Sequence, residues 1–354
     1  MTVDRDCSAD LREQVTAYCQ HNTPMQIVAG GSKAFYGNPV NAQPVVVNGH
    51  RGIVHYEPTE LVLSARCGTP LTEIEQTLAE NQQILGFEPP HFTEHATLGG
   101  SIAAGLSGPA RPFRGAARDF VLGVHMINGK AEHLRFGGEV MKNVAGYDLS
   151  RLLTGSLGTL GVILDVSLKV LPKPEVEQTL GFELSDRIAI QRMNELNLQA
   201  FPISAACHDG EHMYLRLSGN AAAVKSAQKQ IGGEDVRDDV KFWRSLREMT
   251  HPFFQTSRPL WRLSLAAASA PLVIDGKQFI DWGGAQRWLV SDADPDDIRA
   301  RLHDLGGHAT LFRNGGDQPV FHALTGKLHE LHINLKLAFD PQCLFNPGRL
   351  YPDF

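Results

Sequence analysis

Glycine is concentrated in one part of this chain, and that concentration limits the structures which the part can form. Residues 99–161 contain 13 of the 34 glycines in the 354-residue sequence, about one residue in five against a typical usage of about 7%. Glycine weakens the interior of helices and strands, but it permits left-handed backbone and the close approach of other groups. The segment therefore predicts ordered loops between short elements rather than one long helix or strand.

The composition indicates a globular protein that does not bind nucleic acid. Hydrophobic residues make up 42% of the chain and charged residues 20%, and the formal net charge is −6. This balance supplies a packed core, and it lacks the basic excess that binding to phosphate backbones requires. The N-terminal residues 1–11 have no signal-peptide pattern and no run of 18 apolar residues occurs. We therefore expect no direct membrane insertion.

Cysteine usage predicts a reduced, cytoplasmic protein. The five cysteines are odd in number, and no two of them are closer than 12 positions. Disulfide frameworks use paired cysteines, and zinc or iron–sulfur sites use closely spaced ones. We therefore expect neither a disulfide framework nor a cysteine-ligated metal.

The first domain is predicted to span residues 1–174. A strand over 26–29 leads into Gly30, and a hairpin is expected from strands at 120–127 and 131–136 because Asn128-Gly129 favours a type I′ turn. A long strand over 162–170 is followed by Pro172 and Pro174, which are typical of a domain boundary.

The remainder predicts an antiparallel sheet backed by helices, so the fold class is α+β. Strands are expected at 178–184, 203–208, 212–218, 260–265, 281–290 and 309–313, with helices at 186–197, 220–231 and 294–305. We assign this second domain to residues 175–320. A last helix over 321–337 and a tail, residues 321–354 together, are expected to return to the first domain.

Neither of the two common phosphate-binding motifs, the P-loop and the Rossmann glycine motif, matches this sequence. The run from Gly31 to Gly37 has no lysine after its second glycine, and the glycines at 155, 158 and 161 lead into a strand instead of a helix. Two double-glycine loops remain, at 30–33 and 97–105. They could clamp an extended dinucleotide with backbone N–H groups, or they could be turns that need positive φ.

A third glycine segment favours the dinucleotide. The stretch from Gly137-Gly138-Glu139 through Gly146-Tyr147-Asp148 to Gly158-Thr159-Leu160-Gly161 resembles the signature of the FAD-binding domain of the vanillyl-alcohol oxidase type, also called the PCMH type. Over nearly its full length the chain resembles the FAD-binding subunits of bacterial glycolate oxidases. The most specific stretches are residues 135–151, 155–162, 279–288 and 345–350.

The resemblance implies a two-lobed PCMH-type FAD-binding domain followed by an antiparallel-sheet cap domain. It also implies FAD contacts from the glycine loops, from the stretch near the isoalloxazine and from the tail: Gly30, Gly31, Ser32, Lys33, Ala34, Pro90, Thr97, Gly99, Gly100, Ala103, Gly105, Lys142, Gly146, Tyr147, Gly155, Gly158, Gly161, Val162 and Asn346. Many relatives have a histidine in the first loop that is bonded to the flavin. This loop has none, so we expect noncovalent FAD.

Histidine pairs do not predict a metal site. His91 and His95 are four apart, but Pro89-Pro90 opposes a helix there and no glutamate follows the first histidine. The related 2-hydroxy acid dehydrogenases have a His-x-Gly-Asp-Gly-Asn-x-His motif, which is absent here. We expect no bound metal.

Oxidation of a 2-hydroxy acid needs a cation for the carboxylate, a base for the hydroxyl proton and a hydride acceptor. Arg262 and His308 are the candidate catalytic residues, although a surface arginine and a loop histidine explain them equally well. The segment Phe279–Trp288 carries two tryptophans around Gly283-Gly284. It could form part of a flavin lid, a docking surface or buried core.

Three functions remain open at this point. The first is the FAD-containing subunit of a glycolate oxidase complex, whose partners would be a larger flavoprotein subunit and an iron–sulfur subunit, with a membrane link at the cytoplasmic face only through these partners. The second is a self-sufficient FAD-dependent dehydrogenase for glycolate or another 2-hydroxy acid. The third is a non-catalytic subunit that retains the FAD fold.

Overall fold

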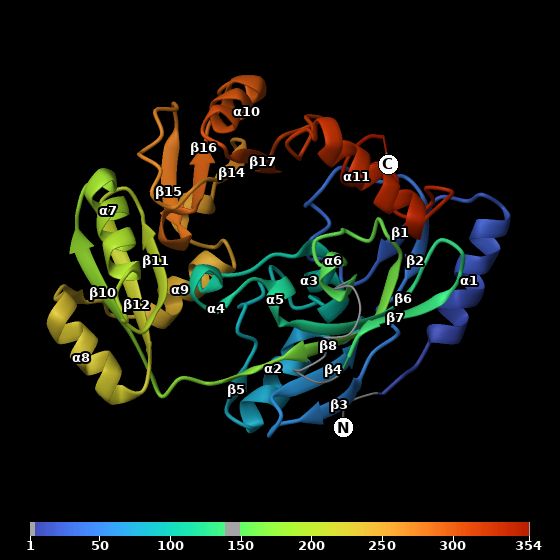
Figure 1. The fold of residues 1–354 in the computed structure, drawn as a ribbon, viewed down its shortest axis with the longest axis horizontal. Coiled ribbons are helices and arrows are strands. Elements are labelled where there is room, and N and C mark those ends of the chain that lie inside the picture. The colour runs from blue at the N-terminus through green and yellow to red at the C-terminus, as the bar shows by residue number, and fades with distance from the viewer. Residues whose placement is uncertain (1–3, 139–148, 354) are drawn as a thin grey trace. The chain divides into compact units, whose positions relative to one another are not determined.

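The computed structural model describes residues 4–138 and 149–353, and it divides the chain into two compact units (Figure 1). The first unit comprises residues 1–106, 116–172 and 323–354, and the second comprises 107–115 and 173–322. The short segment 107–115, which the sequence analysis includes in the first domain, therefore packs with the second unit.

The first unit is built on antiparallel sheet. Among its described residues, a five-stranded sheet has the order β3-β4-β8-β6-β7, beside a parallel pair β1-β2 and a short pair β5-β9 (Figure 1). The strands are β1 Met25–Val28, β2 Gln43–Val46, β3 Ile53–Glu57, β4 Val62–Arg66, β5 Gln83–Ile84, β6 Val121–Ile127, β7 His133–Gly137, β8 Val162–Lys169 and β9 Leu171–Pro172. The helices are α1 Ser8–Gln20, α2 Leu71–Glu80, α3 Leu98–Ala104, α5 Ala117–Phe120, α6 Leu149–Leu152 and α11 Gly326–Phe339.

Strand β8 has a different environment on each of its two faces. Val162, Leu164, Val166 and Leu168 alternate along it and are buried in the main core of this unit, because successive side chains of a strand point to opposite faces. The intervening residues include Ile163, which lines a cleft described below. The predicted strand over 162–170 is thus confirmed, and its second face brings a side chain to the candidate site.

The predicted hairpin forms from β6 and β7, but its turn is not of type I′. Five residues join the strands, Asn128 N–H donates to Glu132 O at 3.1 Å, and the residue with positive φ is Ala131 at 56°. Gly129 serves another purpose, because a Cβ there would lie 2.6 Å from Oδ1 of Asp340. The glycine therefore permits close approach by the residues that follow α11, and the local prediction of a turn type was wrong.

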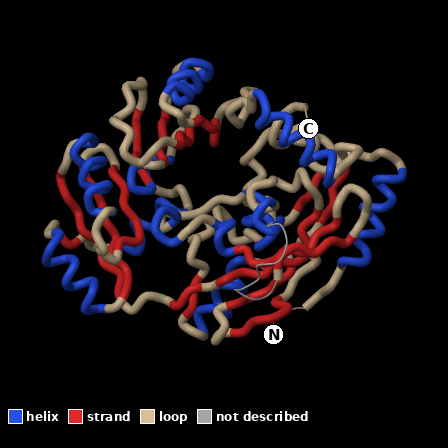
Figure 2. Tube along the Cα trace, in the orientation of Figure 1, coloured by secondary structure: helices blue, strands red, loops and turns tan. Residues whose placement is uncertain are grey.

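The second unit contains one antiparallel sheet with helices packed against it. Its described residues form eight strands in the order β13-β10-β12-β11-β15-β16-β14-β17. The strands are β10 Val176–Glu183, β11 Ile203–His208, β12 His212–Gly219, β13 Glu234–Asp235, β14 Leu260–Ser264, β15 Lys277–Asp281, β16 Gln286–Val290 and β17 His308–Arg313. The helices are α4 Arg111–Arg114, α7 Asp186–Asn197, α8 Ala221–Ile231, α9 Asp239–Arg247 and α10 Pro295–Asp304, and Figure 2 distinguishes them from the strands by colour.

Each half of this sheet has its own core. Leu180, Leu215 and Leu217 pack with residues of α7 and α8, whereas Trp261, Leu263 and Leu311 pack with Ile298 and Leu302 of α10. The predicted antiparallel sheet backed by helices is therefore confirmed.

The predicted strand over 281–290 is a hairpin. Trp282, Gly283 and Gly284 have φ angles of 53°, 62° and 105°, so the backbone reverses between β15 and β16. Trp282 then lies within the second unit, where its indole N–H donates to Gly108 O at 3.1 Å and its ring contacts the guanidinium of Arg111 at 4.3 Å. The unusual sequence of this segment is thus used to hold the inserted segment 107–115.

Candidate functional site

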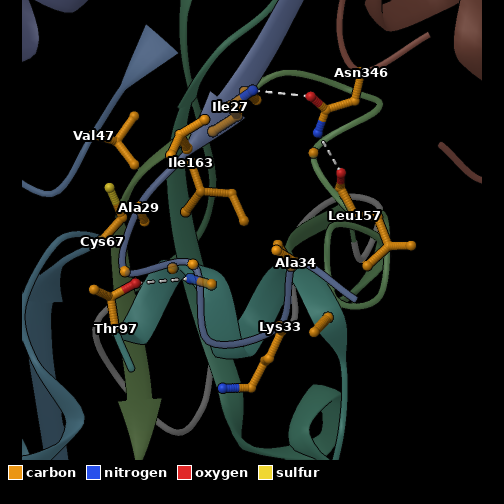
Figure 3. A pocket seen from close by; sticks show the side chains of 18 of the residues that line it. Ile27, Ala29, Lys33, Ala34, Val47, Cys67, Thr97, Leu157, Ile163 and Asn346 are labelled. Carbon is orange, nitrogen blue, oxygen red and sulfur yellow. Dashed lines mark hydrogen bonds between the residues drawn. The ribbon is translucent and has the colours of Figure 1, made fainter. Parts of the chain in front are cut away.

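A cleft with about 990 Å³ of empty space, partly open to solvent, lies in the first unit. Five segments contribute to its lining (Figure 3). They are the first glycine loop at residues 30–34, α3, the third glycine loop at residues 155–161, β8 and the C-terminal tail. Its apolar part is formed by Ile27, Ala29, Val47, Cys67 and Ile163. Segments that are more than 300 residues apart in the sequence therefore meet at one cavity.

The first glycine loop follows β1 and presents unused backbone donors. The N–H groups of Gly30, Gly31 and Ser32 donate no hydrogen bond to any described residue. A Cβ at Gly30 would lie 1.5 Å from the carbonyl oxygen of His95, whereas Gly31 has φ of 69° and open space around it. Gly30 and Ser32 are partly buried, whereas Gly31 is exposed. Partly buried N–H groups need an acceptor, so this loop fits an anionic ligand that supplies one.

The second glycine loop, residues 97–105, permits close packing, and the backbone N–H groups at its double glycine are already bonded within the protein. Thr97 caps α3 by accepting a hydrogen bond from Gly100 N, and Gly99 N donates to Cys67 O at 2.8 Å. The N–H groups of Leu98 and Ser101 are also used within the protein. A Cβ at Gly99 would lie 2.5 Å from Cβ of Cys67, so glycine is needed here for close packing. The sequence-based hypothesis that both loops present free N–H groups was wrong for this one.

The third glycine loop is tied to the C-terminal tail. Gly158 has φ of 72°, and a Cβ there would lie 2.7 Å from Nδ2 of Asn346. Asn346 accepts a hydrogen bond from Ile27 N at 2.9 Å and donates to Leu157 O at 2.6 Å (Figure 3). One buried amide side chain therefore connects the strand before the first loop to the third loop.

Arg349 is a lining residue that sequence reasoning missed. Its Nη1 donates to Asn38 O at 2.8 Å, and its Nη2 donates to Ala34 O and Tyr36 O at 2.9 and 2.7 Å. Burial lowers the pKa of this guanidinium, and no carboxylate among the described residues forms an ion pair with it. The sequence did offer one indication that Arg349 lies at the site, because it follows Asn346 by three residues in the stretch 345–350.

The charge of the cleft is opposite to that of the whole chain. The lining includes Lys33 and Arg349 but no aspartate or glutamate among the described residues, although the chain carries a net charge of −6. Lys33 is only 9% exposed, and its ammonium donates to Ser32 Oγ at 3.2 Å. Burial raises the pKa of the Cys67 thiol, so the cleft gains no thiolate at neutral pH. It is therefore suited to an anionic ligand with an apolar part.

Several predicted FAD contacts lie elsewhere. Gly105 ends α3 with φ of 64°, where a Cβ would lie 2.9 Å from Cα of Gly155, and these two glycines let α3 and the third loop pack together. Pro90 and Val162 are buried. None of the four is among the described residues that line the cleft, which is bordered by Ile163 instead of Val162. The predicted contacts Lys142, Gly146 and Tyr147 lie outside the described residues.

Arg262 and His308 lie in the second unit on neighbouring strands. Arg262 pairs with Thr310, and His308 pairs with Ser264, so these four side chains share one face of the sheet. The opposite face is covered by α10. Loss of hydration, Arg262 and His322 together lower the pKa of His308, which favours the neutral form of its imidazole.

Histidines near the first glycine loop are paired with carboxylates. His91 Nε2 lies 3.2 Å from Glu75 Oε1, and His95 Nε2 lies 3.6 Å from Glu94 Oε1. Within the described ranges no group of three or more histidine, cysteine, aspartate and glutamate side chains could hold a metal ion.

None of the described helices is long and apolar enough to cross a membrane.

We predict that acidification destabilises the second unit through His251. Burial lowers the pKa of this histidine, and its Nδ1 accepts a hydrogen bond from Phe253 N. The unfolded chain therefore binds a proton near pH 6.5 that the folded chain refuses, and stability falls as pH drops below that value. Thermal unfolding from about pH 7.5 to about pH 5.5 should show a smaller loss of Tm in His251→Asn, whose side chain still accepts from Phe253 N. An equal loss in both proteins would contradict the assignment.

The sequence matches known families. Residues 5–137 match the FAD binding domain family. The chain is 48% identical over 348 residues to the glycolate oxidase subunit GlcE of Escherichia coli K12, covering 98% of both chains. It is also 30% identical over 173 residues to the glycolate oxidase subunit GlcD of Bacillus subtilis, covering 48% of this chain and 37% of that protein.

Solved structures share the fold at low sequence identity. The crystal structure of p-cresol methylhydroxylase with substrate bound superposes with a TM-score of 0.72 at 14% identity, covering 99% of this chain and 88% of that one. At this identity the likeness concerns the fold alone. It includes both units, because the superposition covers nearly the whole chain.

Proposed function

This chain belongs to the family of glycolate oxidase subunits that includes GlcE, and from that premise we propose that it is the FAD-binding subunit of a complex that oxidises glycolate to glyoxylate. The single observation that carries the proposal is the cleft in the first unit, where free backbone N–H groups and two cations border an apolar cavity. These features match a cofactor with a diphosphate and a planar apolar ring.

Different residues of the cleft would hold different parts of FAD. The N–H groups of Gly30, Gly31 and Ser32 are the donors for the diphosphate, and Lys33 and Arg349 supply positive charge. The apolar part around Val47 and Ile163 excludes water. FAD, when bound, supplies the acceptor for a hydride or for electrons. The first loop has no histidine, so we propose that the cofactor is held without a covalent bond.

The partners follow from the same family. Two of the relatives, GlcE and GlcD, are named as different subunits of glycolate oxidase. We propose that this chain works with a larger flavoprotein subunit related to GlcD and with an iron–sulfur subunit, since cysteine spacing argues against an iron–sulfur centre on this chain. Any attachment at the cytoplasmic face of the membrane is proposed to come through these partners.

The visible spectrum of the purified chain tests this function. We expect the chain alone, reconstituted with FAD, to show the flavin absorption band and to keep it when glycolate is added. The band should bleach with glycolate only after the partner subunits are supplied. Acid precipitation should release all of the flavin into the supernatant. A chain that retains no FAD would contradict the proposal and favour a non-catalytic subunit.

A second function is favoured by the shared face of Arg262 and His308. A guanidinium beside a neutral imidazole can hold a carboxylate and accept a hydroxyl proton, which are two requirements for oxidising a 2-hydroxy acid. In this self-sufficient dehydrogenase, glycolate would bleach the flavin of the chain alone. Arg262→Ala should then raise the glycolate concentration needed for half-bleaching, while His308→Gln should slow the bleaching.

A further inference from the structure

A buried ion pair lies at the C-terminal end of α11, the last helix of the first unit. Lys336 and Asp340 are 1% and 0% exposed, and Nζ lies 2.8 Å from Oδ2. Removing two charges from water is costly, and apolar side chains of similar size often give equal or greater stability. A pair in this position therefore needs an explanation besides the stability of the helix.

The pair connects three segments through the ammonium of Lys336 and Oδ2 of Asp340, whereas Oδ1 of Asp340 is buried and has no hydrogen-bond partner among the described residues. A lysine ammonium has three N–H donors, and those of Lys336 go to Asp340 Oδ2, Thr159 O and Phe345 O, each at 2.8 Å. Asp340 Oδ2 also accepts from Phe345 N at 2.7 Å. Both backbone polar groups of Phe345 are thus fixed by the pair, and Thr159 belongs to the third glycine loop. The tail and that loop are held to each other at one point.

The residue that follows Phe345 is Asn346, which does line the cleft. Its side chain bonds Ile27 N and Leu157 O, and its own N–H donates to Met25 O at 2.8 Å. Neither Lys336 nor Asp340 is among the described residues that line the cleft. Any influence of the pair on a ligand must therefore act through the tail and the third loop.

We propose that Lys336 and Asp340 are positioning residues for FAD. The pair holds Phe345 and Thr159 in register, and this fixes Asn346 and Gly158 at the edge of the cleft before the cofactor arrives. A preformed site binds more tightly because less order has to be imposed on binding. This inference rests on the proposed function, since it takes FAD as the ligand of the cleft.

The test measures FAD affinity and folding stability separately on apoprotein. FAD fluorescence quenching gives Kd, and denaturant unfolding gives the free energy. We expect Lys336→Met to weaken FAD binding by about tenfold or more, and to alter the visible circular dichroism of the flavin at saturation. Asp340→Asn keeps acceptors for Phe345 N and Lys336 Nζ, and should therefore weaken binding less while remaining folded.

Leu78→Ala is the matched control, because Leu78 is fully buried in the core of the same unit but does not line the cleft. It should lower stability while leaving Kd and the flavin spectrum near those of the wild type. If both Lys336→Met and Asp340→Asn bind FAD with wild-type affinity, or affect Kd only as Leu78→Ala does, the pair is merely structural and the inference is wrong. A wild-type chain that binds no FAD overturns the proposed function as well.

Discussion

Gly30→Ala should yield a chain that retains no FAD. The new Cβ would lie 1.5 Å from the carbonyl oxygen of His95, and two backbone segments must separate before such an overlap is relieved. Overpacking of this kind costs about 3 kcal/mol, and here the displaced segment is the loop whose free N–H groups border the cleft. The absorbance ratio of flavin to protein after purification, together with Kd for added FAD, gives the measurement.

Gly31→Ala is the matched control for that result. A Cβ at Gly31 meets nothing within 4 Å, although φ is 69°, so the substitution carries only the left-handed backbone strain of about 1–2 kcal/mol. We expect this variant to bind FAD more weakly than the wild type but measurably. Equal FAD content in Gly30→Ala and the wild type would show that the first glycine loop does not form the FAD site.

Asn346→Ala is expected to have the second largest effect. The change leaves the N–H of Ile27 and the carbonyl of Leu157 without their side-chain partner. Unsatisfied buried polar groups cost about 1–3 kcal/mol each, so the free energy of unfolding should fall by about 2–6 kcal/mol for the two groups together. FAD binding should weaken as well, because the Asn346 side chain no longer connects the strand before the first glycine loop to the third glycine loop. Denaturant unfolding and FAD titration measure the two effects.

Asn346→Asp separates the connection from the charge. An aspartate can still accept from Ile27 N, but it cannot donate to Leu157 O, and it places a negative charge in a cleft lined by Lys33 and Arg349. If the cleft holds a diphosphate, Asn346→Asp should bind FAD more weakly than Asn346→Ala does. Tighter binding by Asn346→Asp would argue against an anionic ligand at this end of the cleft.

The candidate cleft was partly predictable because its loops leave a local trace. Double glycines after a strand at Val28 predict free N–H groups, and at Gly30–Ser32 the structure has them. The same pattern at Gly99-Gly100 predicts the same role, yet those N–H groups are bonded within the protein. The sequence does not show which acceptors the fold brings near a loop: Gly99 N donates to Cys67 O, and Gly100 N donates to Thr97 Oγ1.

Residues whose partners are distant in the sequence were harder to predict from local patterns. Arg349 bonds three carbonyls that are more than 300 positions earlier, and Lys336 bonds Thr159 across 177 positions. Such contacts depend on where the tail packs, which no local periodicity encodes. Trp282 is a further case, since a strand pattern over 281–290 concealed three successive positive φ angles.

The sequence by itself determined the α+β class, the antiparallel second unit and the concentration of glycine in residues 99–161, because hydrophobic periodicity and backbone freedom are local properties. The tertiary structure decided which glycines serve a ligand and which serve packing. Gly30 and Gly31 border a cleft with free donors, whereas Gly129 admits Asp340 and Gly105 packs against Gly155. The physical reason is that a missing Cβ has a meaning only when the atoms that approach it are known.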